Sequence, residues 1–344
     1  MFTSLPLIYQ PGRLLLITCK KVVTFFLLLL LLHFETGVAA QPPSANVKPI
    51  TKELFSSIRS GDAIELEKLL AGGADANDSL NGYTALMAAA LSGTAEQMQL
   101  LLKHGANINY VAANELCALW LAAHDWDKLN VLLNNGVNMQ QRIRGYSVLV
   151  KLAGMRGTAK NMQLLIDQGV DPKKSSTDNA LLYNAATSGD TASLGLLLRS
   201  GLNANDSIIG GDYPINAALF YRTPAAVKML VEHGANVNVG SASFGLEAFN
   251  GFTPLMFAAV NNDKPSFYYL LEKGADPNIK NKKGYTALML LQQAEEDDPA
   301  MTKALLDHGA EPNIQTPAGN DALHFAMQKG NTQSVAILKK YIKN

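Results

Sequence analysis

The stretch Leu101-Leu102-Lys103-His104-Gly105 contains the pattern that decides the fold. Two large aliphatic residues precede two variable positions and a glycine, and Leu305-Leu306-Asp307-His308-Gly309 repeats the same order. Such a pattern is typical of a helix that buries its aliphatic pair and ends at a residue free to adopt the left-handed conformation. The pattern therefore predicts a helix end at each of these glycines.

Eight copies of this pattern occur along the chain, and each has a small or polar tail such as Ala74-Asp75-Ala76-Asn77 after its glycine. The copies end at Gly73, Gly105, Gly136, Gly169, Gly201, Gly234, Gly274 and Gly309. The successive spacings are 32, 31, 33, 32, 33, 40 and 35 residues. A nearly fixed period indicates structural repeats that stack on their neighbours.

A second pattern opens each unit, most clearly Gly82-Tyr83-Thr84-Ala85-Leu86-Met87-Ala88-Ala89-Ala90 and the stretch from Gly251 to Ala259. The glycine suits a turn, and the threonine suits the N-cap of a helix. Pro254 falls in the first helical turn, where its missing N–H costs nothing. The small alanines allow a second helix to approach closely, so each unit is expected to be a pair of helices.

From about residue 50 to residue 344 the two patterns resemble the ankyrin repeat, a turn and two antiparallel helices of about 33 residues with the signature T-P-L-H-x-A. The resemblance implies an all-α ankyrin-repeat solenoid of about nine helix-turn-helix units with finger loops. The units begin near residues 50, 81, 114, 144, 178, 210, 250, 283 and 318, and the first and last are expected to act as caps.

Several units depart from the family pattern. Only His324 keeps the signature histidine, which is replaced elsewhere by Met87, Trp120, Val150, Tyr183, Asn216, Met256 and Met289. We therefore expect the polar bridges between repeats to be mostly absent. The tail asparagine becomes Gln140 and Lys173 in the third and fourth units, so the middle of the stack is expected to be irregular.

Residues 1–40 have the order of a secretory signal peptide. Arg13, Lys20 and Lys21 precede an apolar run from Val22 to Leu32, and the small residues that suit signal peptidase end at Ala40. We expect cleavage after Ala40, a flexible linker over residues 41–49, and a repeat domain over residues 50–344 that is periplasmic or secreted. An uncleaved leader that anchors the chain in a membrane is the alternative.

The composition excludes several partners. After removal of residues 1–40, 26 basic residues (29 − 3) stand against 28 acidic ones (29 − 1), without a basic stripe for nucleic acid. The mature chain keeps Cys117 alone, which cannot form an internal disulfide and is expected to be buried. Neither a metal motif nor a nucleophile motif occurs, so we predict no catalytic residue, no metal site and no small-molecule cofactor.

The remaining polar candidates have structural interpretations. His104, His233 and His308 precede tail glycines and suit helix C-termini. The acidic run from Glu295 to Asp298 precedes Pro299 and suits a helix N-terminus, although a basic partner is an alternative. Asn77 and Asn205 lie in glycosylation acceptor patterns, which matter only on a eukaryotic export route.

Aromatic and apolar residues give the candidates for partner binding. An insertion from about Gly240 to Phe249 lengthens one finger loop, and its apolar residues could either contact a partner or fold back on the stack. Aromatic residues also recur one position after the turn glycine, where packing competes with a binding role. The candidates are Phe244, Leu246, Phe249, Tyr83, Tyr146, Phe252 and Tyr285.

Taken with the family resemblance, these observations predict a protein-binding scaffold that uses the concave face and finger loops of an exported stack. Its partner would be another protein, which a periplasmic scaffold would stabilise or inhibit. One alternative is a secreted hydrolase with a site in the concave groove, which would need a convergent acid, base and nucleophile. The other is a membrane-tethered adaptor with an uncleaved leader.

Overall fold

The computed structural model describes residues 47–175, 179–242, 247–294 and 296–342. The expected signal peptide, most of the expected linker and the candidates Phe244 and Leu246 lie outside these residues. The chain forms two compact units, and the boundary between them lies between Glu247 and Ala248. The repeat pattern predicts one continuous domain over residues 50–344. The short η2 (Glu247–Phe249) lies at this division.

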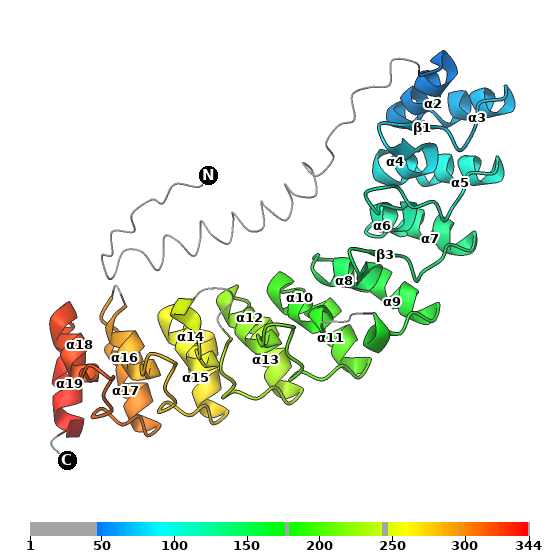
Figure 1. Cartoon of the computed structure of the whole chain (residues 1–344). Coiled ribbons are helices and arrows are strands. Elements are labelled where there is room, and N and C mark those ends of the chain that lie inside the picture. The colour runs from blue at the N-terminus through cyan, green and yellow to red at the C-terminus, as the bar shows by residue number, and fades with distance from the viewer. Residues whose placement is uncertain (1–46, 176–178, 243–246, 295, 343–344) are drawn as a thin grey trace. The chain divides into compact units, whose positions relative to one another are not determined.

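The N-terminal unit stacks six pairs of helices, each with a first and a second helix (Figure 1). The pairs are α2 (Pro49–Ser60) with α3 (Ala63–Ala71), α4 (Ala85–Ser92) with α5 (Ala95–Lys103), α6 (Ala118–Ala122) with α7 (Trp126–Asn134), α8 (Val148–Ala153) with α9 (Ala159–Asp167), α10 (Ala180–Ser188) with α11 (Thr191–Arg199), and α12 (Pro214–Phe220) with α13 (Pro224–Glu232). First helices lie beside first helices and second helices beside second helices. We call the side formed by α4, α6, α8, α10 and α12 the first-helix face.

The C-terminal unit contains three further pairs built in the same way. They are α14 (Pro254–Val260) with α15 (Lys264–Glu272), α16 (Ala287–Gln292) with α17 (Pro299–Asp307), and α18 (Ala322–Lys329) with α19 (Thr332–Ile342). The described residues therefore hold nine helix pairs, which confirms the predicted all-α repeat fold.

The helices begin and end where the two sequence patterns place their boundaries. Thr84 caps α4, because its hydroxyl accepts a hydrogen bond from the Met87 N–H at 3.3 Å. At the end of α5, Gly105 has a φ of 86°, and its N–H donates to the Leu102 carbonyl. The Ala106 N–H donates to the Leu101 carbonyl, which completes a Schellman motif. The left-handed conformation expected of the tail glycine is confirmed here.

Finger loops lead into the first helices, and two of them form small antiparallel ribbons. β1 (Ser79–Leu80) pairs with β2 (Tyr83–Thr84), and β3 (Arg142–Ile143) pairs with β4 (Tyr146–Ser147). The turn of the second ribbon has positive φ at both central residues, 51° at Arg144 and 82° at Gly145. This is the geometry of a two-residue hairpin, which needs glycine at its second position.

The aliphatic pair of each second helix contributes to the core. Leu132 of α7 and Leu270 of α15 hold equivalent positions, and both are fully buried, as the repeat phasing predicts. Ala89, Ala122 and Ala185 of three first helices are also fully buried. Because alanine is small, the second helices can approach the first helices closely.

Tail asparagines connect successive pairs. In the tail after α3, Asn77 Nδ2 donates to the Gly105 carbonyl at 3.0 Å, and the Asn107 N–H donates to Asn77 Oδ1 at 2.8 Å. Asn205 makes the same two bonds to Gly234 and Asn236, at 2.8 and 2.7 Å. One amide side chain therefore satisfies a carbonyl and an N–H of the next tail.

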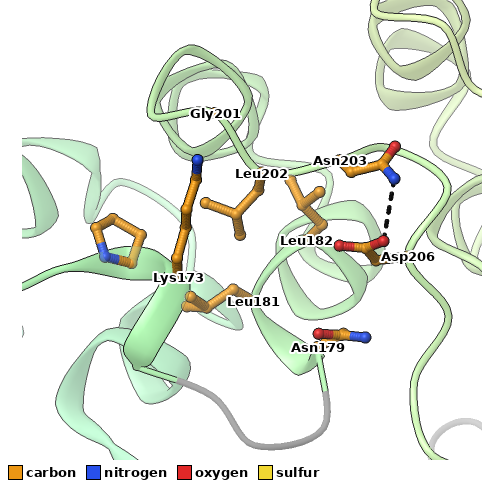
Figure 2. A pocket seen from close by; sticks show the side chains of 9 residues that line it. Lys173, Asn179, Leu181, Leu182, Gly201, Leu202, Asn203 and Asp206 are labelled. Carbon is orange, nitrogen blue, oxygen red and sulfur yellow. Dashed lines mark hydrogen bonds between the residues drawn. The ribbon is translucent and has the colours of Figure 1, made fainter.

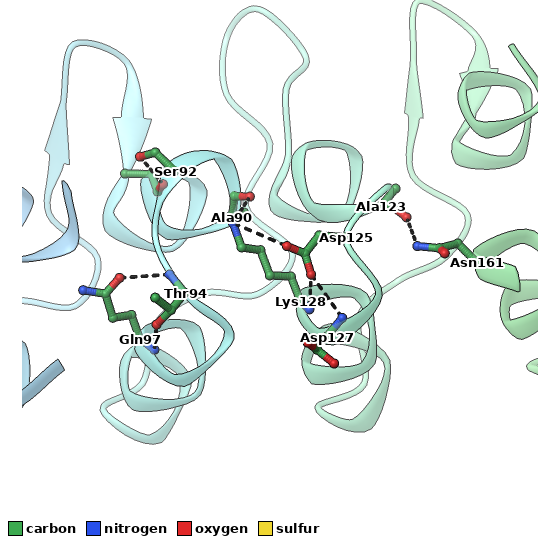
Figure 3. A network of polar contacts seen from close by, with 10 residues as sticks. Ala90, Ser92, Thr94, Gln97, Ala123, Asp125, Asp127, Lys128 and Asn161 are labelled. Carbon is green, nitrogen blue, oxygen red and sulfur yellow. Dashed lines mark hydrogen bonds and ion pairs between the residues drawn. The ribbon is translucent and has the colours of Figure 1, made fainter. Parts of the chain in front are cut away.

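A second set of polar bridges joins the pairs inside the stack, and it corrects the expectation that such bridges would be mostly absent. Gln97 Nε2 donates to the Ser57 carbonyl at 2.9 Å, Lys128 Nζ to Ala90 at 3.2 Å, and Asn161 Nδ2 to Ala123 at 2.8 Å. Figure 3 shows Lys128 and Asn161 reaching back to the preceding pair. The donors come from the third residue of the second helices instead of from the signature histidine of the first helices.

The end of the insertion folds back on the stack. Phe249 is 5% exposed, and its ring lies 5.3 Å from the ring centroid of Phe252 and 5.7 Å from that of Phe257. These three rings form an aromatic cluster at the start of the C-terminal unit. For Phe249 the structure therefore favours the packing alternative over partner contact.

Candidate protein-binding surface

The finger loops of the N-terminal unit expose large apolar side chains. Ile209 is 80% exposed and Tyr146 is 42% exposed, and Tyr110 and Val111 are also exposed. Each of these loops runs directly into a first helix, so the loops border the first-helix face. Exposed apolar side chains on three finger loops supply area for an interaction surface.

Trp120 and Lys151 form a contact between successive helix pairs on the first-helix face. Trp120 lies in α6, and Lys151 lies in α8 of the next pair. Lys151 Nζ donates a hydrogen bond to the Trp120 carbonyl, and it lies 5.4 Å from the centroid of the Trp120 ring. The carbonyl bond and the ring together hold the half-buried ammonium in one place.

The electrostatics around Lys151 are unusual for a lysine. Burial lowers its pKa to about 8. Burial also lowers the pKa of the His124 imidazole, and the nearby charge of Lys151 lowers it further. Among the described residues, no carboxylate lies within ion-pair distance of the Lys151 ammonium. The ammonium has three donors and uses one on Trp120, so two remain for a partner.

The first-helix face continues on α10 with a similar bridge. Asn184 Nδ2 donates to the Val150 carbonyl of α8 at 3.3 Å, and the two residues hold the repeat positions of the donor and acceptor in the Lys151 bond. Beside it, burial raises the pKa of the half-buried Tyr183 hydroxyl, and the negative charges of ionised Tyr221 and Asp212 raise it further. Tyr183 therefore presents a neutral phenol at physiological pH.

Asn216 lies in α12 at the position of the signature histidine, and it is fully buried. Neither its side-chain oxygen nor its side-chain nitrogen has a hydrogen-bond partner among the described residues. Burying an amide without partners costs about 1–3 kcal/mol.

The sequence-predicted binding residues separate into two groups. Tyr146 is exposed on its finger loop, whereas Tyr83 and Tyr285 are half-buried, and the Tyr285 ring lies 5.6 Å from that of Phe325. Phe252 is buried in the aromatic cluster with Phe249. Both phenylalanines must be removed from the contact candidates, because a buried ring offers no area to a partner.

Four residues of this surface were missed from sequence. Tyr110, Val111 and Ile209 lie in loops outside the recurring aromatic position, and Lys151 lies inside an apolar helix. Apolar residues in otherwise polar finger loops are the signal that could have revealed the first three.

The polar candidates have structural roles. His104, His233 and His308 are C-caps of α5, α13 and α17, as predicted. Asp298 caps α17 by accepting from the Met301 N–H at 2.9 Å. Cys117 is buried, and this burial raises the pKa of its thiol. In the part of the chain that the structure describes, no three potential metal ligands of the His, Cys, Asp or Glu type gather.

Comparison with known proteins identifies the family. The family described as "Ankyrin repeats (3 copies)" matches residues 54–143, 182–281 and 255–344. The match covers well over half of the chain and includes helix pairs of both units. The chain belongs to the ankyrin-repeat family.

Three curated relatives share parts of the chain. Ankyrin repeat protein nuc-2 of Neurospora crassa is 28% identical over 263 residues, 73% of this chain and 24% of that protein. Ankyrin repeat and SOCS box protein 6 of Mus musculus is 33% identical over 113 residues, 32% of this chain and 25% of that protein. Ankyrin repeat domain-containing protein M-T5 of Myxoma virus is 49% identical over 39 residues, 11% of this chain and 8% of that protein. The chain thus matches about a quarter or less of each relative.

Ankyrin repeats define the coarse class of this protein, which is a scaffold for protein–protein interaction. Among the described residues, no helix combines the length and the apolar character needed to cross a bilayer.

Proposed function

We propose that this protein is an exported scaffold that binds a protein partner through the finger loops and first-helix face of its N-terminal unit. The observation that carries the proposal is the exposure of Tyr110, Val111, Tyr146 and Ile209 on loops that border this face. Such side chains supply the apolar area that dominates protein interfaces, and aromatic rings are common anchors.

The partner is expected to place a carboxylate against Lys151. The ammonium is already held on Trp120 and keeps two free donors, so little further ordering is needed on binding. A partner carboxylate would form the ion pair that Lys151 lacks among the described residues. This ion pair would raise the pKa of Lys151. Binding would then weaken as the pH rises above about 8, where Lys151 loses its proton.

Export is a second part of the proposal, and it rests on the order of charged, apolar and small residues in positions 1–40. The mature chain is expected to begin at Gln41 and to meet its partner in the periplasm or outside the cell. Intact mass of the protein from that compartment tests this part. A mass that includes residues 1–40 would contradict cleavage and favour the membrane-tethered adaptor.

Partner capture with matched surface variants tests the binding part. Tyr146→Ala and Ile209→Ala each remove apolar area from a finger loop, and each is expected to reduce capture at least about tenfold. Ile64→Ala is the control, because Ile64 is 85% exposed but lies on the second helix α3. Equal losses for all three variants, or no loss for the finger variants, would remove the finger loops from the interface.

A further inference from the structure

A pocket of about 260 Å3 opens between the fourth and fifth helix pairs of the N-terminal unit (Figure 2). One side is η1 (Pro172–Lys174), which follows α9, and the other is the tail that follows α11. Leu181, Leu182 and Leu202 line it with apolar groups, and Lys173 lies at its edge. Residues 176–178 lie outside the described residues.

The pocket lies where the bridge between tails is interrupted. At the regular tails, an asparagine donates to the glycine carbonyl of the next tail and accepts from the N–H two residues beyond that glycine. Lys173 holds the asparagine position in the fourth tail, and the corresponding N–H belongs to Asn203. Because an ammonium has no acceptor, Lys173 cannot receive this hydrogen bond.

The Lys173 ammonium lies against the next tail without a carboxylate partner. A Cβ placed on Gly201 would be 3.1 Å from Lys173 Nζ, so the ammonium reaches the glycine of that tail. Among the described residues, no carboxylate is within ion-pair distance of Lys173, whereas the adjacent Lys174 lies 3.8 Å from Asp171. Asp206 also lines the pocket, and its carboxylate accepts from Asn203 Nδ2 at 3.1 Å.

We propose that this pocket binds a carboxylate carried on a small apolar group. One carboxylate oxygen accepts from the Asn203 N–H in place of the missing asparagine oxygen, and the other accepts from Lys173 Nζ. The apolar group packs on Leu181, Leu182 and Leu202. The pocket volume equals that of roughly nine waters, which suits a ligand the size of one amino-acid residue.

Two sources share this chemistry, namely the C-terminal residue of a peptide and a free short-chain carboxylic acid. Heteronuclear NMR of the full chain with N-acetyl-leucine, hexanoate and N-acetyl-leucinamide distinguishes them. We expect the amide signals of Leu182, Leu202 and Asn203 to shift with one or both acids, with a dissociation constant on the order of 1 mM. A response to N-acetyl-leucine alone assigns the pocket to a peptide terminus, and a response to hexanoate alone assigns it to a free acid.

Variants of the exposed lysines provide the matched controls. Lys173→Met keeps the apolar stem and should weaken acid binding at least about tenfold, while Lys174→Met should leave it unchanged. Lys173→Asn should abolish acid binding and raise the melting midpoint, because the asparagine can rebuild the regular bridge to Gly201 and Asn203. The probes in this test are small molecules, so its outcome does not depend on the protein partner.

Three results would overturn the proposal. One is the absence of any shift with both acids up to about 20 mM, well above the expected dissociation constant. Another is equal binding of the uncharged N-acetyl-leucinamide. The last is full retention of acid binding in Lys173→Met.

Discussion

Lys151 is an ammonium that folding partly removes from water, and burial lowers its pKa to about 8, against about 10.4 in an unfolded chain. Between these values the unfolded chain binds the proton and the folded chain does not, so this residue makes stability rise with pH. Compared with Lys151→Met, the wild-type protein should gain on the order of 1–2 kcal/mol between pH 8 and pH 10.4, after a discount for partial exposure.

Urea unfolding of both proteins over this pH range checks the prediction. The Cys117 thiol is electrostatically coupled to Lys151, so both proteins carry Cys117→Ala and the remaining difference isolates the lysine. A difference that stays flat with pH would mean that the folded ammonium is as well solvated as the unfolded one.

Asn216 offers a stabilising substitution. Its buried side-chain amide has no partner among the described residues, and Asn216→Leu removes the unsatisfied polar atoms while keeping the same number and branching of side-chain heavy atoms. We expect the free energy of unfolding to rise by about 1–3 kcal/mol in denaturant titrations. A loss of stability would reveal a buried water that bonds the amide.

Asn205 tests the bridges between tails. Asn205→Ala removes two hydrogen bonds to the next tail and should lower the free energy of unfolding by about 1–3 kcal/mol in denaturant titrations. Asn313→Ala is the control, because Asn313 holds the equivalent tail position and its side chain bonds no other tail among the described residues. Equal effects of the two variants would show that the bridge contributes nothing.

The tail bridges made by Asn77 and Asn205 also affect whether these asparagines can be glycosylated. Since Asn77 and Asn205 use their side-chain amides within the stack, a folded chain is expected to leave both sites unmodified. Only the acceptor pattern can be read from the sequence. The engagement of the amides depends on residues about 30 positions away, such as Gly105 and Asn236.

At the scale of the helices, the boundaries could be predicted because each repeat carries its own capping residues and its own tail glycine. Thr84 and Gly105 act through neighbours a few positions away, so a local pattern suffices. The bridges made by Gln97, Lys128 and Asn161 could not be predicted in this way. Their donors differ in chemistry from pair to pair, and their acceptors are backbone carbonyls that any residue supplies.

Substitutions of Leu132 and Leu270 test whether each helix pair is coupled to the pairs stacked beside it in the same unit. Both are fully buried, so either substitution to Ala should cost about 2–5 kcal/mol. Hydrogen exchange should rise in the altered pair and in the pairs beside it, and less in remote pairs, because stacked repeats couple through nearest neighbours. Uniform acceleration along the chain would contradict a repeat stack.

At the scale of the whole molecule, the family and the helix pairs followed from the periodic patterns, whereas the binding surface did not. Aromatic recurrence identified Tyr146 but also Phe252, which the fold buries beside Phe249. The repeat position fixes where the aromatic residue lies on the backbone. The neighbouring loop determines whether its ring is buried or exposed to water. The exposure of Ile209 likewise depends on its place in a finger loop.

Hydrogen–deuterium exchange of the full chain with and without its captured partner tests the central claim most directly. The proposed scaffold predicts protection in the finger loops around Tyr110, Tyr146 and Ile209 and in the helices α6 and α8, with little change in α3, α5 and α7. Protection confined to the second helices, with the finger loops unchanged, would contradict the account.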